Sequence, residues 1–357
     1  MKSNSYLRSS VILFLGAGVS APLGKKMMGD FVTHLSLVKD IGKSNLFQAI
    51  ASRKHDLEFL LQELGELESK AYIDDASRLR GTLSLPQFQG IASEASTLIK
   101  NIKREVFLHY RSFDNKASEK IRYHLLPLFD AASKALSPGE PLVVFSTNYD
   151  PAVEEFVQRA SGTFRLFDGF EFDPIRREDI WSPTAFLNWK PSNTNHREIL
   201  LIKLHGSTNW IEHSGRISRS PGPGQVATDD AISNVLVYPA QGKVAAIDPF
   251  FTAYYLFEHF LKSAKRLIAV GYSFRDLDAT TRLRTAMIDN RDLQVGLVAP
   301  NAEEIREMLE RQFIRAVAIP GIYDPTNAAP HFPSSPRGDV VPKIEAFFEE
   351  SRSQISS

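Results

Sequence analysis

The stretch VILFLGAGVSAPLG, residues 11–24, decides the fold of this chain. Its first five residues are apolar and predict a buried strand. The strand runs directly into Gly16-Ala17-Gly18, where small residues let the backbone turn tightly and approach a phosphate, with amides of the next helix facing the anion. Ser20 can add a hydroxyl contact. We therefore expect this turn and Ser20 to bind a phosphate of a dinucleotide; the alternative is a tight strand–helix turn without a ligand.

Short apolar runs alternate with longer amphipathic stretches along the rest of the chain. Six further runs predict buried parallel strands: Leu142–Ser146, Ile199–Leu204, Val235–Pro239, Arg266–Tyr272, Val295–Pro300 and Ala316–Ile319. Six stretches predict helices: Phe31–Lys39, Asp56–Lys70, Gln87–Tyr110, Lys116–Ala135, Phe251–Ser263 and Ala302–Gln312. Because strands alternate with helices, we expect an α/β fold, a Rossmann-like doubly wound parallel sheet.

Two parts of the chain depart from this alternation. Residues 40–137 are almost wholly helical and predict a helical insertion between the first two strands. Residues 212–234 are rich in glycine, proline, serine and charge, and predict a surface loop. The expected nucleotide-binding domain therefore comprises residues 1–39 and 138–325, and residues 326–357 form a tail with one short helix near residues 342–350.

The composition excludes several classes of function. Lysine plus arginine equals aspartate plus glutamate, 42 each, so sequence-specific nucleic-acid binding driven by net charge is not expected. The chain has no cysteine, which excludes disulfides, thiol catalysis and thiolate zinc sites. Its nine histidines are scattered, so no metal site is expected. The apolar run Val11–Leu15 is too short to cross a membrane, and we expect a cytoplasmic protein without a membrane partner.

Polar residues follow two of the predicted strands. The sequence Ser146-Thr147-Asn148-Tyr149-Asp150 follows one strand, and His205 follows another. Because the carboxyl ends of parallel strands meet at one edge of a sheet, Asn148, Asp150 and His205 are expected near the glycine turn. The alternatives are that Asp150 only caps the helix begun by Pro151, and that His205 is a structural hydrogen-bonding residue.

Two later strands end in a similar way. The stretch AVGYSFRDLD, residues 269–278, ends a strand in glycine and continues through Ser273 into a helix with Asp276 in its first turn. Another strand ends at Asn301. Asn301 could act as an N-cap alone, with Glu304 completing a capping box, or as a cap that also contacts a ligand.

The order of these five motifs (GAG with a following serine, TNYD, LHG, GYS-x-x-D and PN) resembles the sirtuin family, and more closely its prokaryotic SIR2-like branch, which is associated with antiviral defence. The resemblance implies a sirtuin-type fold that binds NAD. It assigns NAD contacts to Gly16, Ala17, Gly18, Ser20, Gly271, Tyr272, Ser273 and Asn301, and catalytic positions to Asn148, Asp150 and His205.

The departures from ordinary sirtuins weaken the protein deacylase function. A cysteine-free chain cannot build the four-cysteine zinc module that ordinary sirtuins insert after their HG motif. The G-I-P-D-F-R segment is replaced by residues 25–31, without a matching arginine, and Thr147 stands in place of the glutamine of TQNID. The polar stretch 212–234 is a poor candidate for pairing with an acyl-lysine peptide. These departures do not affect the other half of sirtuin chemistry, the cleavage of NAD, which is therefore the expected activity.

We therefore expect an NAD hydrolase that releases nicotinamide and ADP-ribose. We expect Asn148 to position water or the ribose and His205 to act as the general base. Asp150 is expected to orient its neighbours. The alternatives are an NAD-dependent deacylase or ADP-ribosyltransferase, and a module that senses NAD or ADP-ribose without turnover.

The resemblance also implies control of an NAD-depleting effector in antiphage defence, by a HerA-type ATPase partner or by homo-oligomerisation. The segment His55–Lys70 carries an apolar stripe of Leu57, Leu60, Leu61 and Leu64. This stripe could pack within its own chain or contact a partner.

Overall fold

A computed structural model describes residues 7–54, 56–78, 86–160, 162–192, 195–220, 235–237, 248–325 and 340–354. A seven-stranded parallel sheet forms its centre, in the order β11-β10-β9-β1-β2-β6-β3. The strands are β1 (Val11–Leu15), β2 (Leu142–Ser146), β3 (Phe164–Phe167), β6 (Arg197–Lys203), β9 (Arg266–Val270), β10 (Gln294–Ala299) and β11 (Val317–Pro320). The expected doubly wound parallel sheet is confirmed, with β1 in the middle and the chain extending the sheet to either side of it.

Alternate residues of β1 enter two separate hydrophobic cores. Val11, Leu13 and Leu15 belong to one core, whereas Ile12 and Phe14 belong to the other. Side chains of a strand point to opposite faces, so an apolar run such as VILFL requires cover on both faces. Burial of both faces explains why the strand carries no polar residue.

Helices cover each face of the sheet. On one face lie α7 (Asn115–Lys134), α8 (Ala152–Arg159) and α14 (Val340–Gln354). On the other lie α9 (Pro183–Asn188), α11 (Phe250–Leu261), α12 (Leu277–Asp289) and α13 (Ala302–Glu310). The tail helix α14 packs its Val340, Ile344 and Phe347 into the sheet core. The linker before it, residues 326–339, lies outside the described residues.

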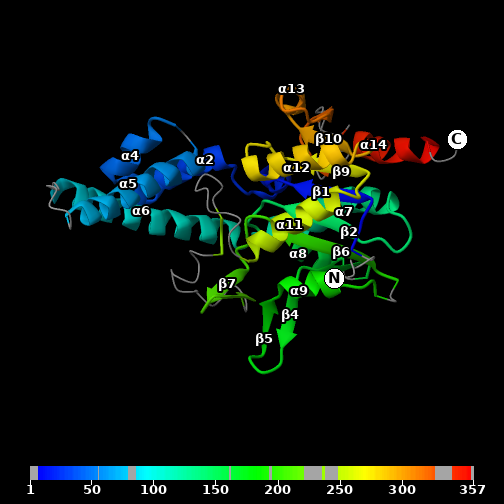
Figure 1. Cartoon of the computed structure of the whole chain (residues 1–357), viewed down its shortest axis with the longest axis horizontal. Coiled ribbons are helices and arrows are strands. Elements are labelled where there is room, and N and C mark those ends of the chain that lie inside the picture. Colours follow the sequence, from blue (N-terminus) through cyan, green and yellow to red (C-terminus); the bar gives the residue numbers. More distant parts are fainter. Residues whose placement is uncertain are drawn as a thin grey trace.

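A separate helical unit lies to one side of the sheet (Figure 1). It contains α2 (Met28–Leu37), α3 (Lys39–Gly42), α4 (Asn45–Ala51), α5 (Leu57–Arg78) and α6 (Pro86–Tyr110), around its own hydrophobic core. The helical unit differs at both ends from the expected insertion, residues 40–137. At the first end, α2 lies before residue 40 but belongs to the helical core; at the other, α7 lies within the expected range but packs on the sheet. The pattern of a helix shows which face is apolar, but not which core receives it.

The leucine stripe of α5 packs inside this helical unit. Leu57, Leu60, Leu61 and Leu64 are each 0% exposed and belong to its core. The stripe is therefore not a surface for a partner.

A four-stranded antiparallel sheet was not expected from the sequence. It consists of β4 (Phe170–Asp173), β5 (Glu178–Trp181), β8 (Arg216–Arg219) and β7 (Trp210–His213), in that order. The prediction of a loop over residues 212–234 is wrong at its start, because β8 and the end of β7 form a hairpin there. Residues 221–234 lie outside the described residues.

The predicted strand Val235–Pro239 is also corrected. Among its residues, 235–237 are described, and Leu236 makes an isolated antiparallel bridge to Gly206 rather than joining the parallel sheet. Val235 and Leu236 pack in the helical core, so their apolar character reflects burial against helices. Within the described residues, no helix combines the length and the apolar character needed to cross a membrane.

Candidate active site

A cavity of about 490 Å³ lies at the carboxyl ends of β1, β2, β6 and β9, between the sheet and the helical unit. Its volume is within the range of small-molecule binding sites. Nine of the eleven residues singled out in the sequence line this cavity: Ala17, Ser20, Asn148, Asp150, His205, Gly271, Tyr272, Ser273 and Asn301. The topology thus brings five separated motifs to one place, which is the expected ligand position of an open α/β sheet.

The two remaining residues, Gly16 and Gly18, serve the packing of two loops. A Cβ atom at Gly16 would lie 2.5 Å from the Gly271 carbonyl oxygen, and one at Gly18 would lie 2.6 Å from the Gly271 Cα atom. Gly271 itself has φ +63°, which favours glycine. The glycines are therefore needed because the turn after β1 touches the turn after β9, and not because a ligand occupies the place of their side chains.

The same contact uses most of the amides that were expected to face an anion. The amides of Gly16 and Gly18 donate to the carbonyls of Val270 and Gly271, at 3.0 and 2.9 Å. The amide of Ala17, the first residue of α1 (Ala17–Ser20), has no acceptor within the helix because first-turn amides have none. Ala17 and the Ser20 hydroxyl, both on the cavity wall, are the groups of this turn that can meet a phosphate.

Asn148 ties the end of β2 to the same turn. Its side-chain amide donates to the Gly16 carbonyl at 2.9 Å and to the Ser20 hydroxyl at 3.2 Å. Asn148 is 9% exposed and lines the cavity. Since its Nδ2 group is used by the protein, Oδ1 is the atom available to a water molecule or a ribose hydroxyl.

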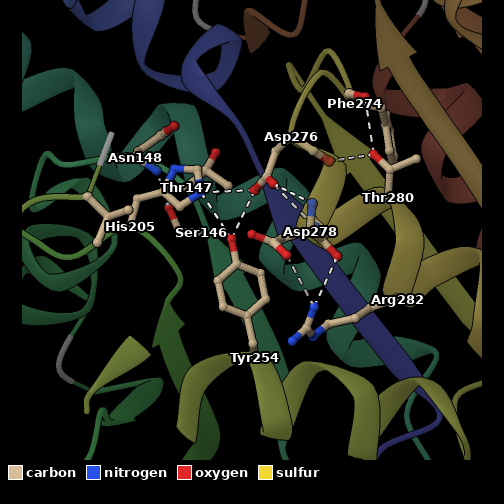
Figure 2. A network of polar contacts seen from close by, with 12 residues as sticks. Ser146, Thr147, Asn148, His205, Tyr254, Phe274, Asp276, Asp278, Thr280 and Arg282 are labelled. Carbon is tan, nitrogen blue, oxygen red and sulfur yellow. Dashed lines mark hydrogen bonds and ion pairs between the residues drawn. The ribbon is translucent and has the colours of Figure 1, made fainter. Parts of the chain in front are cut away.

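His205 contacts Asp276, the carboxylate of the GYS-x-x-D motif, for which the sequence predicted no role in the site. Its Nε2 atom lies 3.0 Å from Oδ2 of Asp276, and the Tyr254 hydroxyl donates to the same oxygen at 3.0 Å. All three residues are buried. Figure 2 shows Tyr254 reaching from α11 towards His205 and Asp276. The GYS-x-x-D motif contains Asp276, but its pairing with His205 depends on two loops that are 71 residues apart.

Asp276 is fixed by both carboxylate oxygens. Oδ1 accepts from the amides of Asp278 and Ala279 and so caps α12, while Oδ2 faces His205. Burial opposes ionisation of Asp276, but the hydrogen bonds from His205 and Tyr254 outweigh it and hold the pKa of this carboxyl below its usual value. An ionised Asp276 accepts a proton-bearing Nε2, which leaves Nδ1 of His205 as the basic atom.

The other predicted residues have mixed roles. The N-cap residue of α8 is Pro151; the Asp150 carboxylate accepts the amide of Ala152, the first residue of α8, at 3.1 Å, and Asp150 also lines the cavity. The expected capping box at Asn301 is wrong: Asn301 is the N-cap residue, but its side chain contacts Glu304 and makes no cap hydrogen bond. The Tyr272 ring packs on Phe14, with ring centroids 4.5 Å apart.

The helical unit supplies the opposite wall of the cavity. Lys25 and Lys26 precede α2, Asp56 and Glu58 begin α5, and all four line the cavity. Burial and the Asp56 carboxylate raise the pKa of Glu58. Arg275 lies 3.7 Å from Asp56 and joins the two walls. Sequence reasoning did not assign these residues, because nothing local places α5 beside the GYS-x-x-D motif.

The segment that replaces G-I-P-D-F-R is anchored by the end of α6. The Lys25 ammonium donates to the carbonyls of His109 and Ser112, at 2.7 and 2.5 Å. The Lys26 amide donates to Nε2 of His109, and the Tyr110 hydroxyl donates to the Lys26 carbonyl. Lys26 and Arg275 are therefore the cations of the cavity wall that can approach a pyrophosphate. Over the described parts of the chain, no group of three or more metal-ligating side chains is found.

A buried His–Asp pair therefore lies beside the glycine turn, at the edge of the doubly wound sheet where folds of this kind bind ligands. Residues 142–317 match a protein family described as the SIR2-like domain. This match supports a relationship to the SIR2-like family, and a SIR2-like domain suggests an enzyme that uses NAD. Strand β1 precedes the matched range but pairs with β2 and β9, so it completes the sheet of that domain.

A solved structure, described as a triple mutant of a Sir2 homologue in complex with 2′-O-acetyl ADP ribose, is similar to this chain with 11% identity and a TM-score of 0.41. The alignment covers 97% of this chain and 95% of that chain. Comparison with curated proteins found no match.

Proposed function

We propose that this protein is an NAD hydrolase that cleaves the bond between nicotinamide and ribose. The observation that carries the proposal is the pairing of His205 with Asp276 in the cavity that Asn148 and the glycine turn also line. The SIR2-like domain supports NAD as the substrate. The Ala17 amide and the Ser20 hydroxyl suit a phosphate, and Lys26 and Arg275 can offset its charge.

The reaction consumes NAD and water and yields nicotinamide, ADP-ribose and a proton. The C–N bond to nicotinamide breaks with its electron pair leaving on the nicotinamide nitrogen, and a C–O bond to water forms. The leaving group departs neutral, so it needs no general acid. The barrier lies in the oxocarbenium-like ribose, which a site lowers by fixing the ribose and the water.

The residues divide this work between them. Oδ1 of Asn148 holds the water or a ribose hydroxyl, and Nδ1 of His205 takes the proton from the attacking water. Asp276 keeps His205 in the required tautomer, as the carboxylate of a Ser-His-Asp triad does. The burial of His205 and Asp276, 5% and 9% exposed, limits competition from bulk water for their hydrogen bond.

Product analysis tests this proposal. The purified chain is incubated with NAD, and nicotinamide, ADP-ribose and labelled protein are measured. Equal amounts of nicotinamide and free ADP-ribose are the expected result, with His205→Ala slower by about 10²–10⁴-fold. O-acetyl-ADP-ribose formed with an acetylated peptide, or ADP-ribose bound to protein, identifies a transferase instead. Binding of NAD without turnover under every condition identifies a sensor.

We also propose that this activity depletes NAD in antiphage defence and that a HerA-type ATPase or homo-oligomerisation controls it. A constitutive NAD hydrolase would harm its own cell, so the activity requires control. The helical unit forms one wall of the cavity and is the part through which a partner can act. Light scattering combined with NAD cleavage, with Glu63→Lys and Glu66→Lys on α5, tests this role. A monomer that is fully active and unaffected by candidate partners contradicts it.

A further inference from the structure

Lys203 is a buried lysine directly beneath the two loops that carry Asn148 and His205. It is the last residue of β6, and its side chain is 2% exposed. Its ammonium donates to the Asp150 carbonyl at 2.5 Å and to the Asn148 carbonyl at 3.2 Å. An ammonium has three donors, and the third side faces the Glu154 carboxylate at 3.7 Å.

Burial of the Lys203 ammonium costs free energy, and the Glu154 carboxylate alone does not offset this cost. At 3.7 Å the nearest carboxylate oxygen, Oε2, is beyond hydrogen-bond distance, and it has no hydrogen-bond partner among the described residues. Burial raises the pKa of Glu154, and the Lys203 charge opposes that rise. The short contacts of Lys203 are with backbone carbonyls, so its principal partners are the backbone of Asn148 and Asp150.

These carbonyls lie where the chain has left β2 and has not yet begun α8. The carbonyl between them, that of Tyr149, accepts from the amide and the hydroxyl of Thr208, at 2.9 and 3.0 Å. Three successive carbonyls after β2 are thus bound by Lys203 and Thr208, the residues that flank His205. These bonds connect the loop of Asn148 to the chain segment that carries His205.

We infer that Lys203 is a positioning residue for the proposed NAD hydrolysis, because its ammonium holds the loop of Asn148 in place relative to His205. The expected effect of Lys203 on turnover rests on the proposed function, whereas its expected effect on the position of the loop does not. Loss of the ammonium removes the donor that binds these two carbonyls in the structure. The loop then relaxes, and a displacement of about 1 Å can cost 10²-fold in rate.

The test distinguishes a role of Lys203 in positioning the Asn148 loop from a role in balancing the charge of Glu154. Lys203→Met alone leaves Glu154 buried without its cation, so it is combined with Glu154→Gln. The double variant, Lys203→Met/Glu154→Gln, holds neither charge. The control is Glu154→Gln alone, which keeps the ammonium on the carbonyls. We expect the control to keep wild-type kcat and the double variant to lose kcat by on the order of 10- to 100-fold, with the NAD Kd changed much less.

A second substitution covers the case in which methionine prevents folding. Lys203→Gln/Glu154→Gln is also uncharged but keeps an N–H donor, so its kcat should lie between those of the control and the methionine variant. Wild-type kcat in the folded double methionine variant overturns the inference.

A crystal structure of the double methionine variant gives a readout independent of activity. The Asn148 amide should have moved away from the Gly16 carbonyl, which it contacts in the wild-type protein at 2.9 Å. An unchanged loop at residues 147–150 overturns the inference. A wild-type protein that does not cleave NAD contradicts the proposed function, and the crystal structure still decides the role of Lys203.

Discussion

Nε2 of His205 and Oδ2 of Asp276 lie 3.0 Å apart in a buried pair that joins the HG motif to the GYS-x-x-D motif. This pair determines which nitrogen of the imidazole carries the proton. With Nε2 protonated towards the carboxylate, Nδ1 remains a base. The chemistry of His205 therefore depends on a residue that lies beyond its own loop.

Asp276→Asn should remove this control while preserving the helix. Asparagine is as good an N-cap as aspartate, so α12 keeps its cap and the melting temperature should change little. The neutral amide cannot stabilise the required tautomer, and kcat should fall by on the order of 10²–10⁴-fold. Steady-state kinetics and thermal melting measure the two effects. Tyr254→Phe is the matched control, since it removes one hydrogen bond to Asp276 but leaves the carboxylate. Equal loss of kcat in both variants would contradict the assignment.

Asn148→Ala should abolish NAD cleavage and also lower stability slightly. The side-chain amide bridges β2 to the Gly16 carbonyl, and loss of one such bond costs about 1 kcal/mol. Urea unfolding and product release measure both consequences. Asn148→Asp is the informative companion, because it keeps the oxygen on the cavity side but places a charge against a carbonyl. Full activity in the folded alanine variant would exclude Asn148 from the site.

Gly18→Ala should destabilise the protein, because its Cβ would lie 2.6 Å from the Gly271 Cα atom and the two loops would have to separate. A loss of about 1–3 kcal/mol is expected from overpacking of this kind. Ala17→Leu is the matched variant, since Ala17 lines the cavity: it should weaken NAD binding with little change in stability. Calorimetry and thermal melting separate the two. A Gly18→Ala protein of unchanged stability would show that the loops do not need this close contact.

Mild acid should destabilise the cavity wall through His109. Burial, together with the charges of Lys25, His34 and Lys26, lowers the pKa of His109 to about 4 from its ordinary value of 6.5. Between these two values the unfolded chain binds more protons than the folded protein, so stability falls as the pH falls from 6.5 towards 4 and is unaffected above 6.5.

His109→Gln should remove this dependence, because glutamine can still accept the Lys26 amide but does not titrate. The melting temperature of the wild-type protein should therefore fall more between pH 7 and pH 5 than that of the variant. The exposed His213 offers a control, His213→Gln, which should follow the wild-type curve. Parallel curves for the wild-type protein and His109→Gln would contradict the expected role.

Local patterns were sufficient for the central sheet. Runs such as Val11–Leu15 and Leu142–Ser146 are apolar on both faces, and this pattern requires a strand covered by helices from both sides. Four-residue strands such as Phe170–Asp173 and Glu178–Trp181 were missed, because they are short, half polar and stabilised by pairing with each other. A helix over residues 116–135 was expected and α7 covers residues 115–134, but its packing on the sheet was not expected, because periodicity does not identify the partner of an apolar face.

The sequence by itself determined that polar residues follow the carboxyl ends of parallel strands, and in such a sheet these ends lie at one edge. That rule of topology is enough to bring Asn148, Asp150 and His205 to the glycine turn. Only the tertiary structure decided which groups hold them. Asp276 and Lys203 make their contacts with residues 71 and 53–55 positions away in the chain. No local pattern encodes such pairs, because they depend on how loops from different strands turn after leaving the sheet.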